Sequence, residues 1–115
     1  MSDGSFAEML RVSDLRNGER LLILRRRKGT TKAQAARKFK VTLYKYNRWE
    51  SDVEQGPKRH VSKLAYFEQS LLMRLRAGAS VAKFARILKV SAWWLRQMEI
   101  GKVSDGRLRS YWKAR

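Results

Sequence analysis

The fold is decided by residues 31–50, TKAQAARKFKVTLYKYNRWE, which recur in diverged form as residues 80–99, SVAKFARILKVSAWWLRQME. In the first copy, Thr31 with Gln34 three residues later is a capping box that begins one helix. Thr42 is the expected cap of a second helix. The second copy has its expected caps at Ser80 and Ser91. Each stretch therefore predicts two short helices joined by a turn.

The repeat extends beyond these two helices. A shift of 49 positions aligns residues 12–50 with residues 61–99 without a gap, and 14 of the 39 aligned positions are identical. Chance is a poor explanation for that identity, so the chain contains an internal duplication. Leu22 to Gly29 predicts a further helix that ends at glycine. The apolar positions after the turn are Val41, Tyr46 and Trp49 in one copy and Val90, Leu95 and Met98 in the other.

Four segments follow from the repeat and its flanks. They are a first helix-turn-helix unit (1–52), a linker (53–60), a second unit (61–103) and a basic amphipathic tail (104–115). Gly56 and the only proline, Pro57, mark the linker. Units this small are near the lower limit of independent folding. We therefore predict an all-α protein in which two tandem helix-turn-helix units pack as a compact helical protein.

The charge of the chain indicates its partner. Lys and Arg number 27 against 10 for Asp and Glu, which gives a net charge of +17, while 43% of the residues are hydrophobic. A basic protein with a real core is expected to bind a polyanion, because each neutralised phosphate releases condensed counterions. Charge alone does not separate DNA, RNA and anionic lipid.

Several classes of function lack their residues here. The chain has no cysteine, and its single histidine, His60, lies in the expected linker without a cluster of metal ligands nearby in sequence. No glycine-rich phosphate loop of the nucleotide-binding types is present. The longest apolar stretch, Leu21 to Leu24, is too short to span a bilayer. We therefore expect a cytoplasmic protein that is not an enzyme, uses no cofactor or metal and does not enter a membrane.

The ordered cues of each repeat resemble the helix-turn-helix of the Cro and phage-repressor (XRE-like) family. The cues are Ala36 and Ala85, Val41-Thr42 and Val90-Ser91, and Glu50 and Glu99. The resemblance covers nearly all of each repeat and implies that helix 43–49, and in the second unit helix 92–98, enters the major groove of double-stranded DNA. It also implies a bacterial or bacteriophage setting, with the DNA-bound protein associated with the nucleoid.

Two features of the family carry structural expectations. An arginine late in the first helix often pairs with the glutamate that ends the recognition helix, and the matching pairs here are Arg25 with Glu50 and Arg74 with Glu99. We expect both to be structural ion pairs. Lys40 and Lys89 stand where the family usually has glycine. Because lysine at positive φ costs about 1–2 kcal/mol, we expect a less tight turn.

The first recognition helix supplies the residues expected to touch DNA. The candidates for base reading are Leu43, Tyr44, Lys45, Asn47 and Arg48. Arg48 is the strongest of these, because a bidentate arginine suits guanine. The candidates for phosphate contacts are Lys28, Thr31, Lys32 and Thr42. The threonines and Lys32 lie at expected helix amino termini, where backbone amides favour a phosphate; these contacts would position the protein without reading sequence.

The second recognition helix has a different character. Its candidate DNA or partner surface comprises Ser91, Ala92, Trp93, Trp94, Arg96 and Gln97, with the residues from 92 onward facing outward. Adjacent tryptophans do not both fit on one buried stripe, so at least one is expected to be exposed. Three alternatives stay open for it: packing into the neighbouring unit or the tail, a homodimer or protein-partner surface, and contact with bases.

Together these features predict a sequence-specific DNA-binding transcriptional regulator, either repressor or activator. The alternatives are a protein-interaction regulator such as an antiactivator that uses the Trp93/Trp94 surface, and a DNA-architectural or recombination-accessory factor. The tail has Leu108, Tyr111 and Trp112 at helical spacing, so it is expected to form a short helix that seals the core or an oligomer contact.

Overall fold

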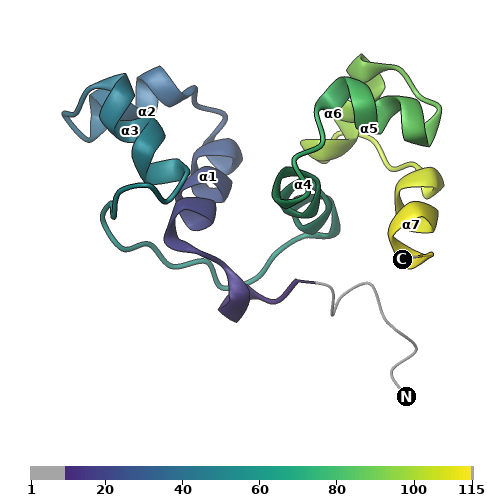
Figure 1. Ribbon diagram of the computed structural model, residues 1–115, viewed down its shortest axis with the longest axis horizontal. Helices are drawn as coiled ribbons and strands as arrows, with labels where there is room; N and C mark the ends of the chain where they lie inside the picture. Colours follow the sequence, from purple (N-terminus) through teal and green to yellow (C-terminus); the bar gives the residue numbers. More distant parts are fainter. Residues whose placement is uncertain (1–9, 115) are drawn as a thin grey trace. The chain divides into compact units, whose positions relative to one another are not determined.

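The computed structural model describes residues 10–114 and contains helices and no strand in that range. The elements are the 3-10 turn η2 (Val12–Asp14) and helices α1 (Asn17–Lys28), α2 (Lys32–Lys38), α3 (Leu43–Glu50), α4 (Tyr66–Arg76), α5 (Val81–Leu88), α6 (Ala92–Glu99) and α7 (Gly106–Lys113) (Figure 1). The predicted all-α class is confirmed. Residues 1–9, where the first unit was expected to begin, and the final residue of the tail lie outside the described residues.

The starts of the helices follow the offset of the sequence repeat. Each of α4, α5 and α6 begins 49 residues after its counterpart α1, α2 or α3, at positions 66, 81 and 92 against 17, 32 and 43. Helices α3 and α6 also end 49 residues apart, at Glu50 and Glu99. The duplication therefore repeats a three-helix scaffold, and each copy holds one helix-turn-helix.

Side-chain caps determine where the short helices begin. The backbone amide of Gln34 donates to Thr31 Oγ1 over 3.1 Å, and Gln34 Oε1 accepts from the Thr31 amide over 2.9 Å. The hydroxyl of Thr42 accepts from the amide of Lys45 over 3.1 Å. Ser80 and Ser91 accept the equivalent bonds in the second unit. All four predicted caps are present, and each satisfies an amide that the helix leaves unpaired.

The turn between the two helices of each motif is tight, so the expectation of a looser turn is wrong. Lys40 has φ 59° and Lys89 has φ 61°, both in the left-handed region. The next residue in each copy closes the turn: Val41 donates its amide to the Ala36 carbonyl and Val90 to the Ala85 carbonyl, both over 3.0 Å. This bond from the residue after the left-handed position satisfies a terminal helix carbonyl and offsets the cost of lysine there.

An aromatic cluster fills the core of the first unit. Tyr46 is 1% exposed and lies between Leu21 of α1 and Ala35 of α2, with Trp49 and Phe39 beside it. The Phe39 ring stacks on Tyr46 with centroids 6.1 Å apart and meets the edge of Trp49 at 5.6 Å. Large aromatic side chains thus supply the apolar area where the second helix contributes only alanines.

The segment expected to be a linker belongs to the first unit. The side-chain amide of Asn17 donates to the Pro57 carbonyl and accepts from the Arg59 amide, both over 2.9 Å. A Cβ on Gly56 would lie 2.8 Å from the Trp49 indole, so the backbone packs directly on that ring. The first unit therefore comprises residues 12–63, which corrects the predicted linker at 53–60.

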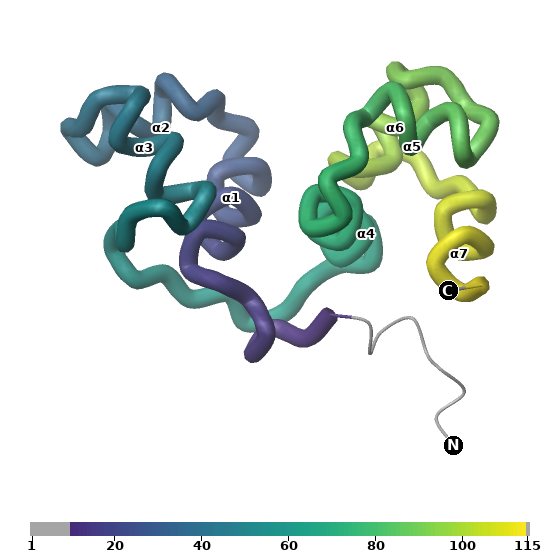
Figure 2. Tube along the Cα trace, viewed as in Figure 1, coloured from purple at the N-terminus to yellow at the C-terminus, as the bar shows by residue number. Residues whose placement is uncertain are grey.

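The segment expected to be a tail is part of the second unit. Helix α7 buries Leu108 and Trp112 in the same core as Phe84, and the Trp112 indole donates to Ser70 Oγ over 2.7 Å. Figure 2 follows the chain from α6 into α7. The described part of this unit is residues 64–114 with Leu10 and Arg11, which corrects the boundary at 103. The predicted helix is present and seals the core of its own unit.

Candidate nucleic-acid interface

The carboxyl end of α3 is anchored to the carboxyl end of α1 by a charged clamp. Arg25 Nε donates to Glu50 Oε2 over 2.6 Å, and Arg25 Nη2 donates to Glu50 Oε1 over 3.3 Å. Arg25 Nη1 also donates to the Thr30 carbonyl over 3.0 Å. One guanidinium thereby holds three points: α1, the loop before α2 and the end of α3. This fork geometry is what arginine provides and lysine does not.

The hydroxyl of Tyr46 joins the same clamp from within the core. It donates to Glu50 Oε2 over 2.5 Å. Burial, followed by the neighbouring Glu50 carboxylate, raises the pKa of Tyr46. The hydroxyl therefore stays protonated and remains a donor, which keeps the buried carboxylate satisfied and fixes the rotation of α3 about its own axis.

The opposite face of α3 is open to solvent. Leu43 is 46% and Tyr44 is 72% exposed, whereas Tyr46 and Trp49 face the core. Lys45 and Asn47 are exposed and Arg48 is half-buried. The structure therefore brings the five predicted base-reading residues together on one capped helix, with apolar, hydroxyl, amide and cationic groups side by side.

Glu54 makes a contact that the sequence analysis missed. Its Oε2 lies 2.7 Å from Lys45 Nζ, and its Oε1 lies 3.2 Å from Arg48 Nε. The bond from Lys45, followed by that from Arg48, holds the pKa of Glu54 below its ordinary value. The same carboxylate raises the pKa of Arg48. The Arg48 guanidinium also lies 5.6 Å from the centroid of the Tyr44 ring. Both basic side chains of the exposed face are therefore held in place by one carboxylate.

The backbone explains why Glu54 reaches that face. After α3 the chain reverses at Asp52, which has φ 60°. The amides of Val53 and Glu54 then donate to the Arg48 carbonyl over 3.0 and 3.2 Å. This fold-back places a residue from the expected linker on α3. No motif in the sequence signals it, because a left-handed aspartate is uncommon and the segment reads as a plain loop.

Three of the four phosphate candidates lie where they were predicted. Thr31 and Lys32 are at the start of α2 and Thr42 is at the start of α3, and all are exposed. Lys28 is different. It lies beside Lys38 of α2, and both side chains line a pocket of the first unit. Thr30 and Gln34, near the start of α2, line the same pocket.

The second unit repeats the clamp in a more buried form. Arg74 Nε donates to Glu99 Oε2 over 2.6 Å, and Arg74 Nη2 donates to Oε1 over 3.0 Å. The side chains of this pair are 7% and 3% exposed, against 12% and 4% for Arg25 and Glu50. Both predicted ion pairs are present, and both have the same bidentate geometry.

The two adjacent tryptophans of α6 have different surroundings. Trp93 is 60% exposed. Trp94 packs against the core of the second unit, and its indole donates to Asp105 Oδ2 over 2.7 Å. The expectation that Trp94 faces outward is therefore corrected: packing against the tail accounts for it. Of the other residues on this surface, Ser91 and Arg96 are exposed, while Ala92 and Gln97 are half-buried.

Asp105 is the second residue that the sequence analysis missed. It accepts from the Arg107 amide over 2.9 Å, which caps α7, and its Oδ2 lies 2.8 Å from Arg107 Nη2. The bonds from Arg107, followed by that from Trp94, hold the pKa of Asp105 well below its usual range. One carboxylate therefore joins the start of α7 to α6. The Ser104-Asp105-Gly106 segment, with an aspartate before an apolar periodic stretch, is the signal that would have identified the cap.

Comparisons of the chain with protein-family models, with curated proteins and with solved structures find no match. Over residues 10–114, no helix has both the length and the apolar character needed to cross a membrane. In the same range, no group of three or more His, Asp or Glu side chains is arranged to hold a metal ion.

Proposed function

We propose that the protein is a sequence-specific double-stranded DNA-binding regulator of transcription that reads the major groove with α3. The observation that carries this proposal is the solvent-facing side of α3, where Tyr44, Asn47 and Arg48 stand on a helix whose other side is locked into the core. A protruding helix of this kind fits the major groove, and its side chains can bond to base edges. The resemblance to the Cro and phage-repressor family rests on the same helix.

Charge supports the same proposal. The chain carries +17, and no more than 10 acidic residues compete with phosphates. Thr31 and Lys32 are exposed at the start of α2, and Thr42 is exposed at the start of α3. The hydroxyl groups of Thr31 and Thr42 accept the capping bonds and still have a proton to donate. Contacts of this type would set the register of the protein on the duplex, while the α3 side chains would select the sequence.

A second candidate function follows from Trp93. This indole is 60% exposed on α6, at the position that Tyr44 occupies on α3. Exposed tryptophan is enriched at the energetic centres of protein interfaces. A role in which α6 binds a protein partner, as in an antiactivator, is therefore the alternative to DNA reading for the second unit.

Selection of bound fragments from random DNA, followed by footprinting, tests the proposal. We expect one discrete protected site that survives physiological salt and competitor DNA. Arg48→Ala is expected to cost about 1–3 kcal/mol at a single base pair, because it removes a bidentate reader. Lys32→Ala is expected to weaken all sequences alike. Lys102→Ala, an exposed lysine in the loop after α6, is the charge-matched control.

Three results would contradict the proposal. Uniform coating of DNA that disappears at physiological salt would favour an architectural role. Binding to a protein but to no DNA would favour the antiactivator. Equal losses on every sequence for Arg48→Ala and Lys32→Ala would remove Arg48 from base reading, and with it the central contact of α3.

A further inference from the structure

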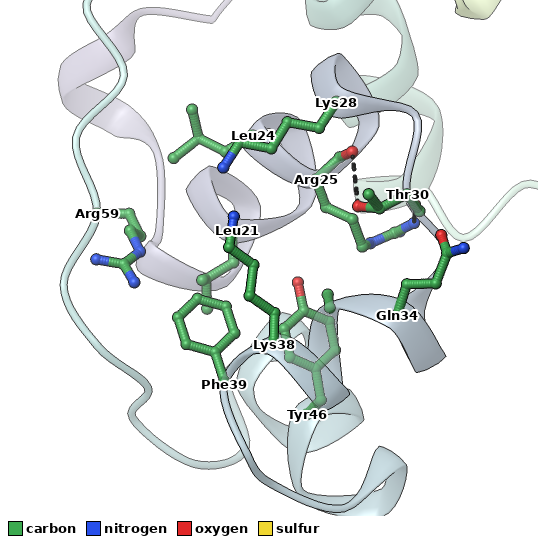
Figure 3. A pocket seen from close by; sticks show the side chains of 11 residues that line it. Leu21, Leu24, Arg25, Lys28, Thr30, Gln34, Lys38, Phe39, Tyr46 and Arg59 are labelled. Carbon is green, nitrogen blue, oxygen red and sulfur yellow. Dashed lines mark hydrogen bonds between the residues drawn. The ribbon is translucent and has the colours of Figure 1, made fainter.

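The first unit has a pocket of about 240 Å³ beneath α1 and α2. Its apolar lining includes Leu21 and Leu24 of α1 and the ring of Phe39 at the end of α2 (Figure 3). Lys28, Lys38 and Arg59 line the same pocket from three different segments of the chain. The pocket thus combines an apolar wall with three cationic side chains.

Two of these cations, Lys28 and Lys38, lie close together, and no acidic residue is among the lining residues of the pocket. Figure 3 shows the side chains of Lys28 and Lys38 extending toward each other from α1 and α2. The neighbouring ammonium group of Lys38 lowers the pKa of Lys28, as expected where two like charges are close. Arg25 also lines the pocket, but its charge is neutralised by Glu50. The guanidinium of Arg59 lies 5.0 Å from the centroid of the Phe39 ring.

The second unit shows what the same part of the scaffold looks like when protein fills it. Leu21, Lys28, Ala35 and Lys38 correspond, 49 residues on, to Ser70, Ala77, Phe84 and Ile87. There the Trp112 indole donates to Ser70 Oγ, and its ring lies 5.7 Å from that of Phe84. An indole from α7 and a phenyl ring from α5 thus close the groove.

The residues that differ between the two copies at this place change both its volume and its charge. Phe84 is replaced by Ala35, which leaves room between the helices, and Ala77 and Ile87 are replaced by Lys28 and Lys38. The first unit therefore has free space and positive charge where the second unit has the rings of Phe84 and Trp112. An occupant that matches both would have an apolar body and a negative charge.

We propose that this pocket binds a small organic anion with an apolar body, a carboxylate on a short aliphatic chain or an aromatic ring. The carboxylate would lie between Lys28 and Lys38, and the apolar body would rest on Leu21, Leu24 and Phe39. Pockets for drug-sized ligands span about 300–1,000 Å³, so the volume here selects a smaller molecule. This inference does not rest on DNA binding, because none of the predicted base-reading residues lines the pocket.

Titration of the full chain with octanoate, followed by amide NMR shifts, tests the proposal. We expect saturable shifts confined to the amides around α1, α2 and residue 59. Octanol supplies the apolar body without the charge, and inorganic phosphate supplies the charge without the body. Each is expected to bind about tenfold more weakly than octanoate, since each lacks one of the two interactions.

Single substitutions distinguish binding of octanoate in the pocket from non-specific attraction of an anion to a basic protein. Lys38→Gln is expected to weaken octanoate binding about fivefold, because it removes a charge-assisted bond. Lys28→Gln repeats the test from the other helix. Lys83→Gln, an exposed lysine on α5 of the second unit, is the matched control and should change nothing.

The amide spectra of the free variants report whether each one is folded. Octanol binding as tightly as octanoate would overturn the proposal in favour of a merely apolar groove. Phosphate binding as tightly would overturn it in favour of a simple anion site. Equal weakening by Lys83→Gln, or the absence of saturable shifts near the pocket, would also overturn it.

Discussion

In the first unit, α3 presents Tyr44 and Arg48 to solvent, and Glu54 binds the Arg48 side chain. In the second unit, α6 presents Trp93 to solvent, and the neighbouring Trp94 donates a hydrogen bond to Asp105. Beneath these surfaces, both copies use the same clamp, the same caps and the same left-handed lysine. The shared features are those that the scaffold needs. The differing features are free of that requirement, and they are where each unit can acquire its own partner.

Among the tests of this comparison, the largest expected change in stability comes from breaking the clamp in each unit, Arg25–Glu50 or Arg74–Glu99. Arg74→Met leaves Glu99 buried without its partner, and breaking a buried pair in this way costs about 3–5 kcal/mol. Arg25→Met should cost less, because Arg25 is 12% exposed against 7% for Arg74. Urea unfolding of the full chain, followed through amide signals of each unit, measures both losses.

A paired variant gives the control for the clamp. Arg74→Met combined with Glu99→Leu removes both charges, so it should recover much of the stability lost by Arg74→Met alone. If Arg25→Met and Arg74→Met lower the free energy of unfolding by the same amount, the difference in burial between the two clamps has no energetic consequence. If the second unit is unaffected by Arg74→Met, the clamp does not hold α6.

The exposed aromatic residues of α3 and α6, Tyr44 and Trp93, give the next largest expected effect. If only α3 reads DNA, Tyr44→Ala should weaken binding to the selected site by about 1–3 kcal/mol, the range for a good base contact. Trp93→Ala should change it by no more than about 0.5 kcal/mol, as a surface substitution away from the interface does. Gel-shift titration on the selected site measures both. Equal losses would mean that both units contact DNA.

The shared scaffold was predictable from the sequence because its signals are local. A threonine or serine before each short helix, together with a repeat offset of 49 residues, places the starts of α2, α3, α5 and α6 correctly. Helix α1, by contrast, begins at Asn17, five residues before the expected Leu22. The clamp pairs follow from the same offset, since Arg25 and Glu50 recur as Arg74 and Glu99. The residues of α3 that face away from the core follow from helical periodicity once Tyr46 and Trp49 are taken as buried.

The rest depended on contacts between segments that no local pattern announces. Asn17 binds the backbone 40 residues later, at Pro57, and so attaches the expected linker to the first unit. Glu54 reaches Arg48 because the chain reverses at a left-handed Asp52. The positive φ of Lys40 also goes against its intrinsic preference, and the bond from the Val41 amide to the Ala36 carbonyl offsets that cost. Such choices are settled by packing rather than by propensity.

The left-handed lysines offer a smaller test, one in which the two copies should respond alike. Lys40→Gly and Lys89→Gly relieve a steric cost of about 1–2 kcal/mol, less the entropy that glycine adds to the unfolded chain. We expect each to stabilise its own unit by about 0.5–1 kcal/mol in urea unfolding. Lys83→Gly, within α5, is the control and should destabilise by about 1 kcal/mol. Destabilisation by either turn variant would show that the lysine side chain contributes more than its backbone costs.

The smallest expected effect concerns Asp105, which has no counterpart in the first unit. Its pKa in the folded protein is depressed below the ordinary value of 3.8, so its contribution to stability is fully present above 3.8 and is lost progressively as the pH falls from 3.8 towards the lower folded pKa. Asp105→Asn removes the charge at the start of α7 and should cost about 0.3–1 kcal/mol at pH 7. The measurement is urea unfolding of wild type and variant at pH 7 and at pH 3.

The difference in unfolding free energy between wild type and Asp105→Asn should be smaller at pH 3. At that pH the Asp105 carboxyl group of the unfolded wild-type chain takes up a proton, while that of the folded protein stays ionised. The narrowing should be confined to amide signals of the second unit, since the bonds of Asp105 go to Arg107 and Trp94 in that unit. Signals of the first unit serve as the internal control. A gap that is as wide at pH 3 as at pH 7 would show that α7 is held by the burial of Leu108 and Trp112 alone, and that the carboxylate only caps a helix already in place.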